Sequence, residues 1–98
     1  MPKKTYAKNG ATCRVTFELP DAAHAVTASV CGDFNDWSAA AHPMIRRSDG
    51  RFSITVSLPA GRSYRYRFFL DGQRWENDWA ADAYVTNDFG GEDCLLEL

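Results

Sequence analysis

Six carboxylates lie within two residues of an aromatic residue and are the first candidates for chemistry: Asp33, Asp36, Asp71, Glu76, Asp78 and Asp82. Hydrolysis of a glycosidic bond needs two carboxyl groups held at a fixed separation across a cleft. A chain of 98 residues forms one small domain, which leaves little room for a deep cleft. We therefore interpret each of these acids as a turn former or a solvated side chain, and we predict no catalytic pair.

The nucleophiles and the metal-binding side chains are scattered along the chain. No serine lies in a G-x-S-x-G sequence, and the two histidines, His24 and His42, fall in loop-like stretches. The three cysteines form neither a C-x-x-C pair nor an even set for disulfides. We expect reduced thiols at Cys13, Cys31 and Cys94, in or near the core, and therefore a cytoplasmic location. The sequence predicts a protein that is not an enzyme and needs no metal or other cofactor.

Tryptophan is the residue type whose placement points to a ligand. Trp37, Trp75 and Trp79 lie in or beside polar turns, whereas the strands hold enough other apolar residues for a core. An exposed indole offers flat apolar area and loses little conformational entropy on binding. The C–H face of a pyranose can stack on such a ring, and its hydroxyls then need polar partners such as an outward-facing Arg67. Composition leaves a second interpretation open, because exposed aromatic residues also occur in protein–protein interfaces.

The elements that must position these residues are short β-strands. Apolar and polar residues alternate with a period of two, which is typical of strands with one buried face. Asp49-Gly50 and Asp71-Gly72 each separate two such runs and predict tight hairpin turns, and Pro20-Asp21 predicts the end of the first strand. The runs that we interpret as strands cover residues 13–19, 25–31, 44–47, 51–58, 63–70, 73–75, 83–86 and 94–98.

Side-chain parity assigns a buried face to each strand. In the run 63–70, Tyr64, Tyr66, Phe68 and Leu70 share one face, and Arg65, Arg67 and Phe69 lie on the other. In the run 25–31, Val26, Ala28 and Val30 share a face. Without any helical pattern, these strands predict an all-β fold, an Ig-like antiparallel β-sandwich of seven to eight strands.

Charge is distributed unevenly. All three lysines lie in the first eight residues, and eight acids with one base, Arg74, follow from Asp71 to the end. We predict a flexible basic N-terminal tail over residues 1–10 and a single domain over residues 11–98. The acidic final third argues against a nucleic-acid partner, which needs a basic stripe. No apolar run reaches membrane-spanning length, so no membrane partner is expected either.

Three motifs occur in the order found in a known family. Residues 32–38, GDFNDWS, resemble the family's G-x-F-N-x-W signature, and residues 66–72, YRFFLDG, followed by Trp75, resemble its Y-K/R-F-x-x-D-G-x-W segment. Residues 77–92 resemble the corresponding segment of bacterial members. Over residues 11–98 the chain thus resembles the family-48 carbohydrate-binding modules. These include the glycogen-binding domain of the AMP-activated protein kinase β subunit and the N-terminal early-set domains of isoamylases and branching enzymes.

The resemblance implies an early-set, Ig-like β-sandwich that binds α-1,4-linked glucans, such as glycogen or maltooligosaccharides, without catalysis. It implies that Trp37 and Trp75 stack on the sugar, that Arg67 bonds its hydroxyls and that Phe89 packs into the turn of the glucan. Asp93 stands where glucan-binding relatives carry Asn. An ionised carboxylate only accepts hydrogen bonds, whereas an amide also donates them, so the bond pattern at Asp93 is expected to differ.

Two alternatives accompany this interpretation. Trp79 stands where relatives usually carry Pro, and we interpret it as a cover for its own loop, the alternative being an extension of the stacking surface. The aromatic face could also dock a separately encoded glucan-metabolising enzyme, which would make the chain a protein-interaction module. Asn87 is a further candidate for hydrogen bonds to hydroxyls.

Overall fold

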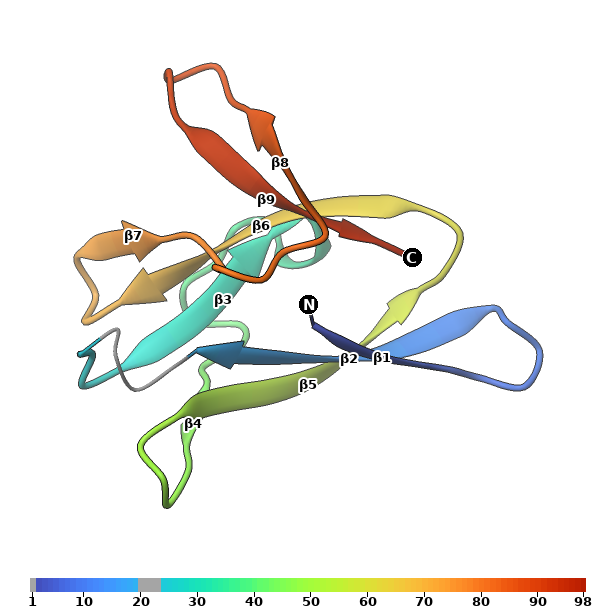
Figure 1. Ribbon diagram of the computed structural model, residues 1–98, viewed down its shortest axis with the longest axis horizontal. Coiled ribbons are helices and arrows are strands. Elements are labelled where there is room, and N and C mark those ends of the chain that lie inside the picture. The colour runs from blue at the N-terminus through green and yellow to red at the C-terminus, as the bar shows by residue number, and fades with distance from the viewer. Residues whose placement is uncertain (1, 20–23) are drawn as a thin grey trace.

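The strands form where the sequence alternates, and they build two antiparallel sheets that face one another (Figure 1). The computed structural model describes residues 2–19 and 24–98 of the chain. Those residues contain nine strands and one turn of 3₁₀ helix, η2 (Asp33–Asn35). The expected all-β class and Ig-like sandwich are confirmed, with nine strands instead of seven or eight.

The first sheet has the strand order β1-β2-β5-β4. Its centre is the pair β2 and β5, which are in register from Thr12 opposite Pro59 to Leu19 opposite Phe52. The turn at Asp49-Gly50 joins β4 to β5, as the sequence predicted. The strands of this sheet are β1 (Lys3–Tyr6), β2 (Thr12–Leu19), β4 (Ile45–Arg46) and β5 (Phe52–Pro59).

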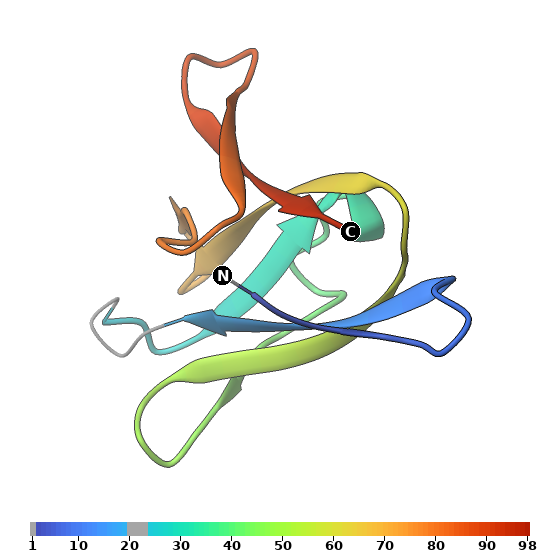
Figure 2. The same ribbon diagram turned by 45° about the vertical axis from the view of Figure 1, so that its right-hand side comes forward.

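The second sheet is organised around β6 (Ser63–Leu70). On one side β6 pairs with β3 (Ala28–Gly32). On its other side it pairs first with β9 (Glu92–Glu97) and then with β7 (Arg74–Glu76). β9 continues past β6 and pairs with β8 (Ala83–Thr86), and this hairpin projects away from the rest of the sandwich (Figures 1 and 2).

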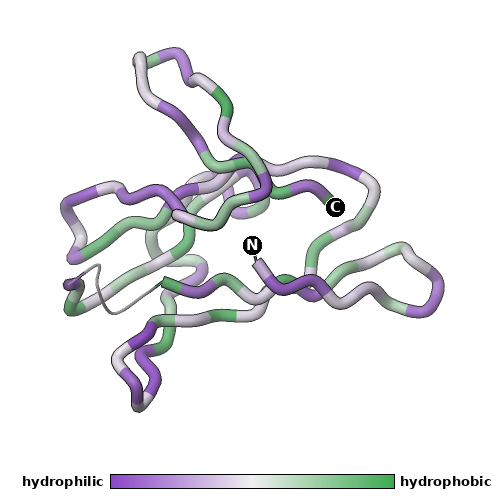
Figure 3. The backbone as a smooth tube through the Cα atoms, viewed as in Figure 1, coloured by the Kyte–Doolittle hydropathy of each residue, from purple (hydrophilic) through white to green (hydrophobic). Residues whose placement is uncertain are grey.

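The core lies between the two sheets. Tyr64, Tyr66, Phe68 and Leu70 of β6 are all buried, as the alternation predicted. The ring of Tyr66 meets the ring of Phe17 from β2 edge to face, with their centroids 5.0 Å apart. Figure 3 shows hydrophilic residues gathered at the β1–β2 and β4–β5 turns, so the polar ends of the hairpins lie outside this core.

The N-terminal residues differ from the sequence prediction. A flexible tail was expected over residues 1–10, but Lys3–Tyr6 form strand β1 on the edge of the first sheet. Two contacts distant in sequence hold it: Lys4 Nζ lies 2.6 Å from Asp82 Oδ2, and the Tyr6 hydroxyl donates to the Leu98 carbonyl at 3.2 Å. Because β1 is an edge strand with mostly exposed side chains, it has no apolar alternation that could have signalled it.

The strand expected over residues 25–31 is also different, because β3 begins only at Ala28. Val26 is 75% exposed and does not share the buried face of Ala28 and Val30. The reason is a contact distant in sequence: the N–H groups of Val26 and Thr27 both donate to Asp71 Oδ1.

Two further predictions concern the turn after the first predicted strand and the absence of a membrane-spanning segment. The turn predicted at Pro20-Asp21 lies outside the described residues. In the part of the chain that is described, no helix is long and apolar enough to cross a membrane.

Candidate functional site

The outer face of β6 forms the floor of the candidate site. Because Tyr64 and Tyr66 face the core, the alternation places Arg65, Arg67 and Phe69 on the opposite face, away from the first sheet. Residues of three further segments line the site with this face: the turn after β3, strand β7 and the turn between β8 and β9.

The turn after β3 directs Trp37 outward. Asn35 holds the turn from inside, since its Oδ1 accepts the Gly32 N–H at 3.0 Å and its Nδ2 donates to the Val30 carbonyl at 3.0 Å. The backbone N–H of Trp37 donates to the Gly32 carbonyl at 2.9 Å and closes the turn. Phe34 packs inward against the core. The G-x-F-N-x-W sequence therefore places one aromatic ring in the core and one on the surface.

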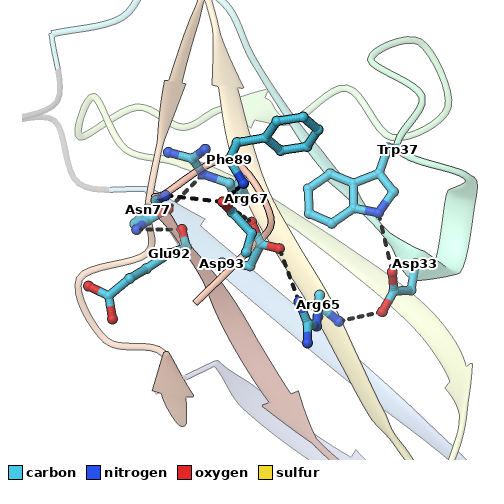
Figure 4. A network of polar contacts seen from close by, with 10 residues as sticks. Asp33, Trp37, Arg65, Arg67, Asn77, Phe89, Glu92 and Asp93 are labelled. Carbon is cyan, nitrogen blue, oxygen red and sulfur yellow. Dashed lines mark hydrogen bonds and ion pairs between the residues drawn. The ribbon is translucent and has the colours of Figure 1, made fainter. Parts of the chain in front are cut away.

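Trp37 is held in a strained backbone conformation. Asp36 and Trp37 have φ values of 54° and 58°, in the left-handed region that bulky residues rarely adopt. Such residues are frequent at functional sites. The indole Nε1 donates to Asp33 Oδ1 at 3.2 Å, and Asp33 Oδ2 accepts the backbone N–H of Arg65 at 2.8 Å (Figure 4). Asp33 thus ties the Trp37 turn to the floor of the site.

Trp75 lies over the other end of the floor. It is opposite Phe69 in the β6–β7 ladder, and the two ring centroids are 4.6 Å apart. The Arg67 guanidinium carbon lies 5.9 Å from the Trp75 ring centroid. The Trp37 and Trp75 rings are 6.2 Å apart with an interplanar angle of 67°. The two indoles therefore meet at an angle and do not form one flat surface.

Arg67 lies on β6 between the segment that pairs with β9 and the segment that pairs with β7. β9 pairs with β6 at residues 63–66, and β7 pairs with it at residues 68–70. Asn77 connects Arg67 of β6 to β9, because its Oδ1 accepts Arg67 Nε–H at 2.8 Å and its Nδ2 donates to the Glu92 carbonyl at 3.1 Å (Figure 4). The bond at Nε fixes the side chain and leaves the terminal N–H groups of the guanidinium for other partners.

The β8–β9 turn carries Phe89, which is 96% exposed. Figure 4 shows its ring pointing across the site toward Trp37. Asn87 stabilises this turn, since its Oδ1 accepts the N–H groups of Phe89 and Gly91 at 3.0 and 3.1 Å. Its Nδ2 donates to Asp93 Oδ1 at 3.1 Å.

These side chains enclose an open groove of about 470 Å³. All five residues predicted for the site line it, and Asn87 does so too: Trp37, Arg67, Trp75, Phe89 and Asp93. The structure adds Asp33, Arg65 and Asp88. Arg65 could have been found from its parity with Arg67, whereas nothing in the sequence signals Asp88. Two arginines against three aspartates leave the lining close to neutral, which favours an uncharged ligand over a polyanion.

Trp79 is not part of this groove. It lines a separate, smaller hollow of about 240 Å³, together with Lys3, Thr16 and Glu18 of the first sheet. Its Nε1 donates to Glu76 Oε1 at 3.4 Å. The structure therefore separates Trp79 from Trp37 and Trp75, and it lies over the seam between the two sheets.

None of the three cysteines lines the groove. Cys13, Cys31 and Cys94 are free and buried, as the sequence predicted. Burial raises the pKa of Cys94 to about 11 and also raises that of Cys31, so both thiols are protonated at neutral pH. Among residues 2–19 and 24–98, no group of three or more His, Cys, Asp or Glu side chains is placed to hold a metal ion.

Comparison with known proteins gives a consistent result. The chain matches the family model of carbohydrate-binding module 48 (isoamylase N-terminal domain) over residues 7–85. This confirms the resemblance seen in the motifs and includes Trp37, Arg67 and Trp75, whereas Phe89 and Asp93 follow the matched segment.

Two curated relatives contain similar segments. The 1,4-alpha-glucan branching enzyme GlgB of Aquifex aeolicus (strain VF5) is 35% identical over 66 residues, which are 66% of this chain and 10% of the enzyme. An alpha-amylase of Niallia circulans is 38% identical over 58 residues, which are 57% of this chain and 4% of the amylase. The chain thus spans a tenth or less of the relatives that it matches.

Proposed function

Because the chain belongs to the carbohydrate-binding module 48 family, we propose that it binds α-1,4-glucans, as glycogen, a similar polymer or maltooligosaccharides, in the groove between Trp37 and Trp75. The observation that carries this proposal is the pair of indole rings, 6.2 Å apart and inclined by 67°, beside Arg67. The protein acts by association alone, without a catalytic step or a cofactor.

The inclined rings suit the shape of this polymer. The axial linkage of an α-1,4-glucan turns each glucose relative to the previous one, so the apolar faces of successive sugars are not coplanar. Two indoles at an angle can each stack on a different sugar of such a curved chain, whereas a straight β-1,4-glucan would reach only one of them. Phe89 packs into the inner side of the curve, and Arg67 donates hydrogen bonds to hydroxyls.

The groove is open and its contact area is small, so we expect dissociation constants of about micromolar to millimolar magnitude. Storage glucans present many equivalent sites, which raises the effective concentration of ligand for a weak module. The buried, free cysteines agree with a reducing compartment, and we propose the cytoplasm.

A titration of intrinsic tryptophan fluorescence tests the proposal. Maltoheptaose and β-cyclodextrin should give a saturable change, and cellohexaose should give none. Trp75→Ala should abolish the response, and Trp37→Ala should remove binding while the thermal unfolding transition remains. Trp79→Ala is the matched control, because this indole lies outside the groove, and it should bind like the native protein. No response at millimolar α-glucan, or loss of binding in Trp79→Ala alone, would refute this site.

The second candidate function is docking of a separately encoded glucan-metabolising enzyme. The nearly complete exposure of Phe89, beside the exposed Trp75, favours it, since such side chains often anchor protein interfaces. Excess maltoheptaose separates the two functions. If the aromatic face is made for a protein partner, excess maltoheptaose does not compete that partner away; if the face is a glucan site, maltoheptaose occupies it and displaces whatever was bound there.

A further inference from the structure

Asp93 is the buried acid of the groove. The residue is only 8% exposed, although it lines the site. Its Oδ1 accepts the Asn87 amide at 3.1 Å, and its Oδ2 faces Arg65 Nη1 at 3.8 Å. A buried carboxylate is stable when both oxygens have polar or charged partners. Both oxygens of Asp93 thus have a partner within the protein, Oδ1 through a hydrogen bond and Oδ2 through a longer ion pair.

The first partner of Asp93 controls the turn that carries Phe89. Asn87 accepts the N–H groups of Phe89 and Gly91 with its Oδ1, and its own N–H donates to the Gly91 carbonyl at 2.9 Å. The hydrogen bond from its Nδ2 to Asp93 Oδ1 favours this orientation of the amide. The backbone of the turn that carries Phe89 is therefore connected to Asp93 through one intermediate side chain.

The second partner of Asp93 is a polar side chain that reaches the groove. The side chain of Arg65 is 46% exposed, and it lines the groove next to Trp37 and Asp33. A guanidinium has five N–H donors, so one ion pair at Nη1 leaves others for hydroxyl groups. Arg65 also belongs to the face of β6 that carries Arg67, two residues along the same strand.

We propose that Asp93 is a positioning residue, and that Arg65 is the side chain that donates to glucan hydroxyls at this end of the groove. Asp93 orients Arg65 through the ion pair and fixes the Phe89 turn through Asn87. The inference rests on the proposed function, because it takes a neutral glucan as the ligand. It deepens that function by replacing a direct contact from position 93 with two indirect effects.

Conservative variants separate the two effects. In Asp93→Asn, the new Oδ1 can still accept from Asn87, but the charge that orients Arg65 is gone. In Asp93→Ala, both effects are lost. Asn87→Ala removes the support of the turn together with the hydrogen bond to Asp93 Oδ1, and Arg65→Gln removes the guanidinium together with its ion pair to Asp93. Glu92→Gln, the exposed acid next in sequence, and Arg14→Gln, an exposed arginine of the first sheet, are charge-matched controls.

The first measurement is the affinity for maltoheptaose. Arg65→Gln should weaken binding about three- to tenfold, as expected for one or two lost hydrogen bonds, and Asp93→Asn about two- to fivefold. The double variant should bind like Arg65→Gln alone, because Asp93 acts through Arg65. Asp93→Ala should bind more weakly than Asp93→Asn, and the two controls should bind like the native protein. Native or tighter binding by Asp93→Asn, or native binding by Arg65→Gln, would overturn the inference.

The second measurement needs no ligand. Amide hydrogen exchange at Phe89 and Gly91, followed by NMR, should become faster in Asn87→Ala and Asp93→Ala and stay unchanged in Asp93→Asn. Unchanged exchange in Asp93→Ala would overturn the role of Asp93. If the native protein fails to bind maltoheptaose, the proposed function fails and the role of Arg65 fails with it, whereas the exchange pattern still decides the positioning of the turn.

Discussion

Phe69 and Trp75 face each other across the β6–β7 ladder, with their ring centroids 4.6 Å apart and their planes inclined by 43°. Phe69 does not line the groove, but it is the ring against which Trp75 packs. An aromatic pair of this kind contributes about 0.5–1.5 kcal/mol beyond its buried area. Trp75 is therefore oriented before a ligand arrives, and the entropy that it must lose on binding is reduced.

Replacement of Phe69 tests this preorganisation. Phe69→Ala should weaken maltoheptaose binding about three- to tenfold, because Trp75 loses its support, and should lower stability by only about 1–2 kcal/mol. Isothermal titration calorimetry measures the first effect and urea unfolding the second. Phe69→Tyr keeps the ring and should bind within about twofold of the native protein. Equal affinity in Phe69→Ala would show that Trp75 is oriented by other contacts.

Gly32 is required because β3 and β6 approach closely at the start of the Trp37 turn. A Cβ at Gly32 would collide with the Arg65 carbonyl oxygen and would lie 2.9 Å from Tyr66 Cβ. Gly32→Ala should therefore cost about 1–3 kcal/mol of the free energy of unfolding, as overpacking does in a rigid core. Urea unfolding followed by far-UV circular dichroism measures the loss.

Gly91→Ala provides the comparison for Gly32. A Cβ at Gly91 would lie 3.5 Å from Asn87 Nδ2, which is an ordinary contact. This variant should stay within about 0.5 kcal/mol of native stability. A similar loss in both variants would mean that the close approach at Gly32 is not the cause.

The sequence predicted the parts of the fold that depend on local alternation. The two faces of β6 followed from parity alone, and so did the outward direction of Arg67. β1 could not be predicted, because its mostly exposed side chains give no apolar alternation and its contact from Lys4 to Asp82 spans 78 residues. The exposure of Val26 likewise depends on a hydrogen bond from its N–H to Asp71, 45 residues away.

Contacts between residues distant in sequence also limited what could be predicted of the site. The motifs identified Trp37 and Trp75 through the family resemblance, but the 67° angle between their rings depends on how the Trp37 turn lies beside strand β7. The pairing of Arg65 with Asp93 crosses from β6 to β9, and no local pattern joins the two residues. Sequence reasoning therefore found residues of the groove and could not assign which of them support the others.

Asp71 gives the fold a defined response to acid. Its Oδ1 accepts the N–H groups of Thr27 and Val26 at 3.0 and 2.7 Å, and these bonds lower the pKa of the carboxyl group. Because the folded pKa lies below the unfolded value of about 3.9, the contribution to stability is present above that value and is lost as the pH falls through the folded pKa.

Asp71→Asn keeps an acceptor oxygen and removes the charge. The variant should melt below the native protein at neutral pH, and the difference should shrink as the pH falls below about 4. Thermal unfolding followed by circular dichroism between neutral and acidic pH measures it. A difference in melting temperature that is constant over this range would contradict a role for the charge.

The three buried cysteines provide a readout of global opening. Cys94 has a pKa of about 11 because burial disfavours its thiolate, and the Asp78 N–H donates to its sulfur at 3.1 Å. A thiol-specific reagent such as dithiobis(nitrobenzoate) should therefore label the native protein at least about tenfold more slowly than the protein in urea, where all three thiols react. If the thiols react only after global unfolding, their labelling rate should be higher in Gly32→Ala and unchanged in Gly91→Ala. Rapid labelling of any thiol in the native protein would show that the core opens locally at that residue.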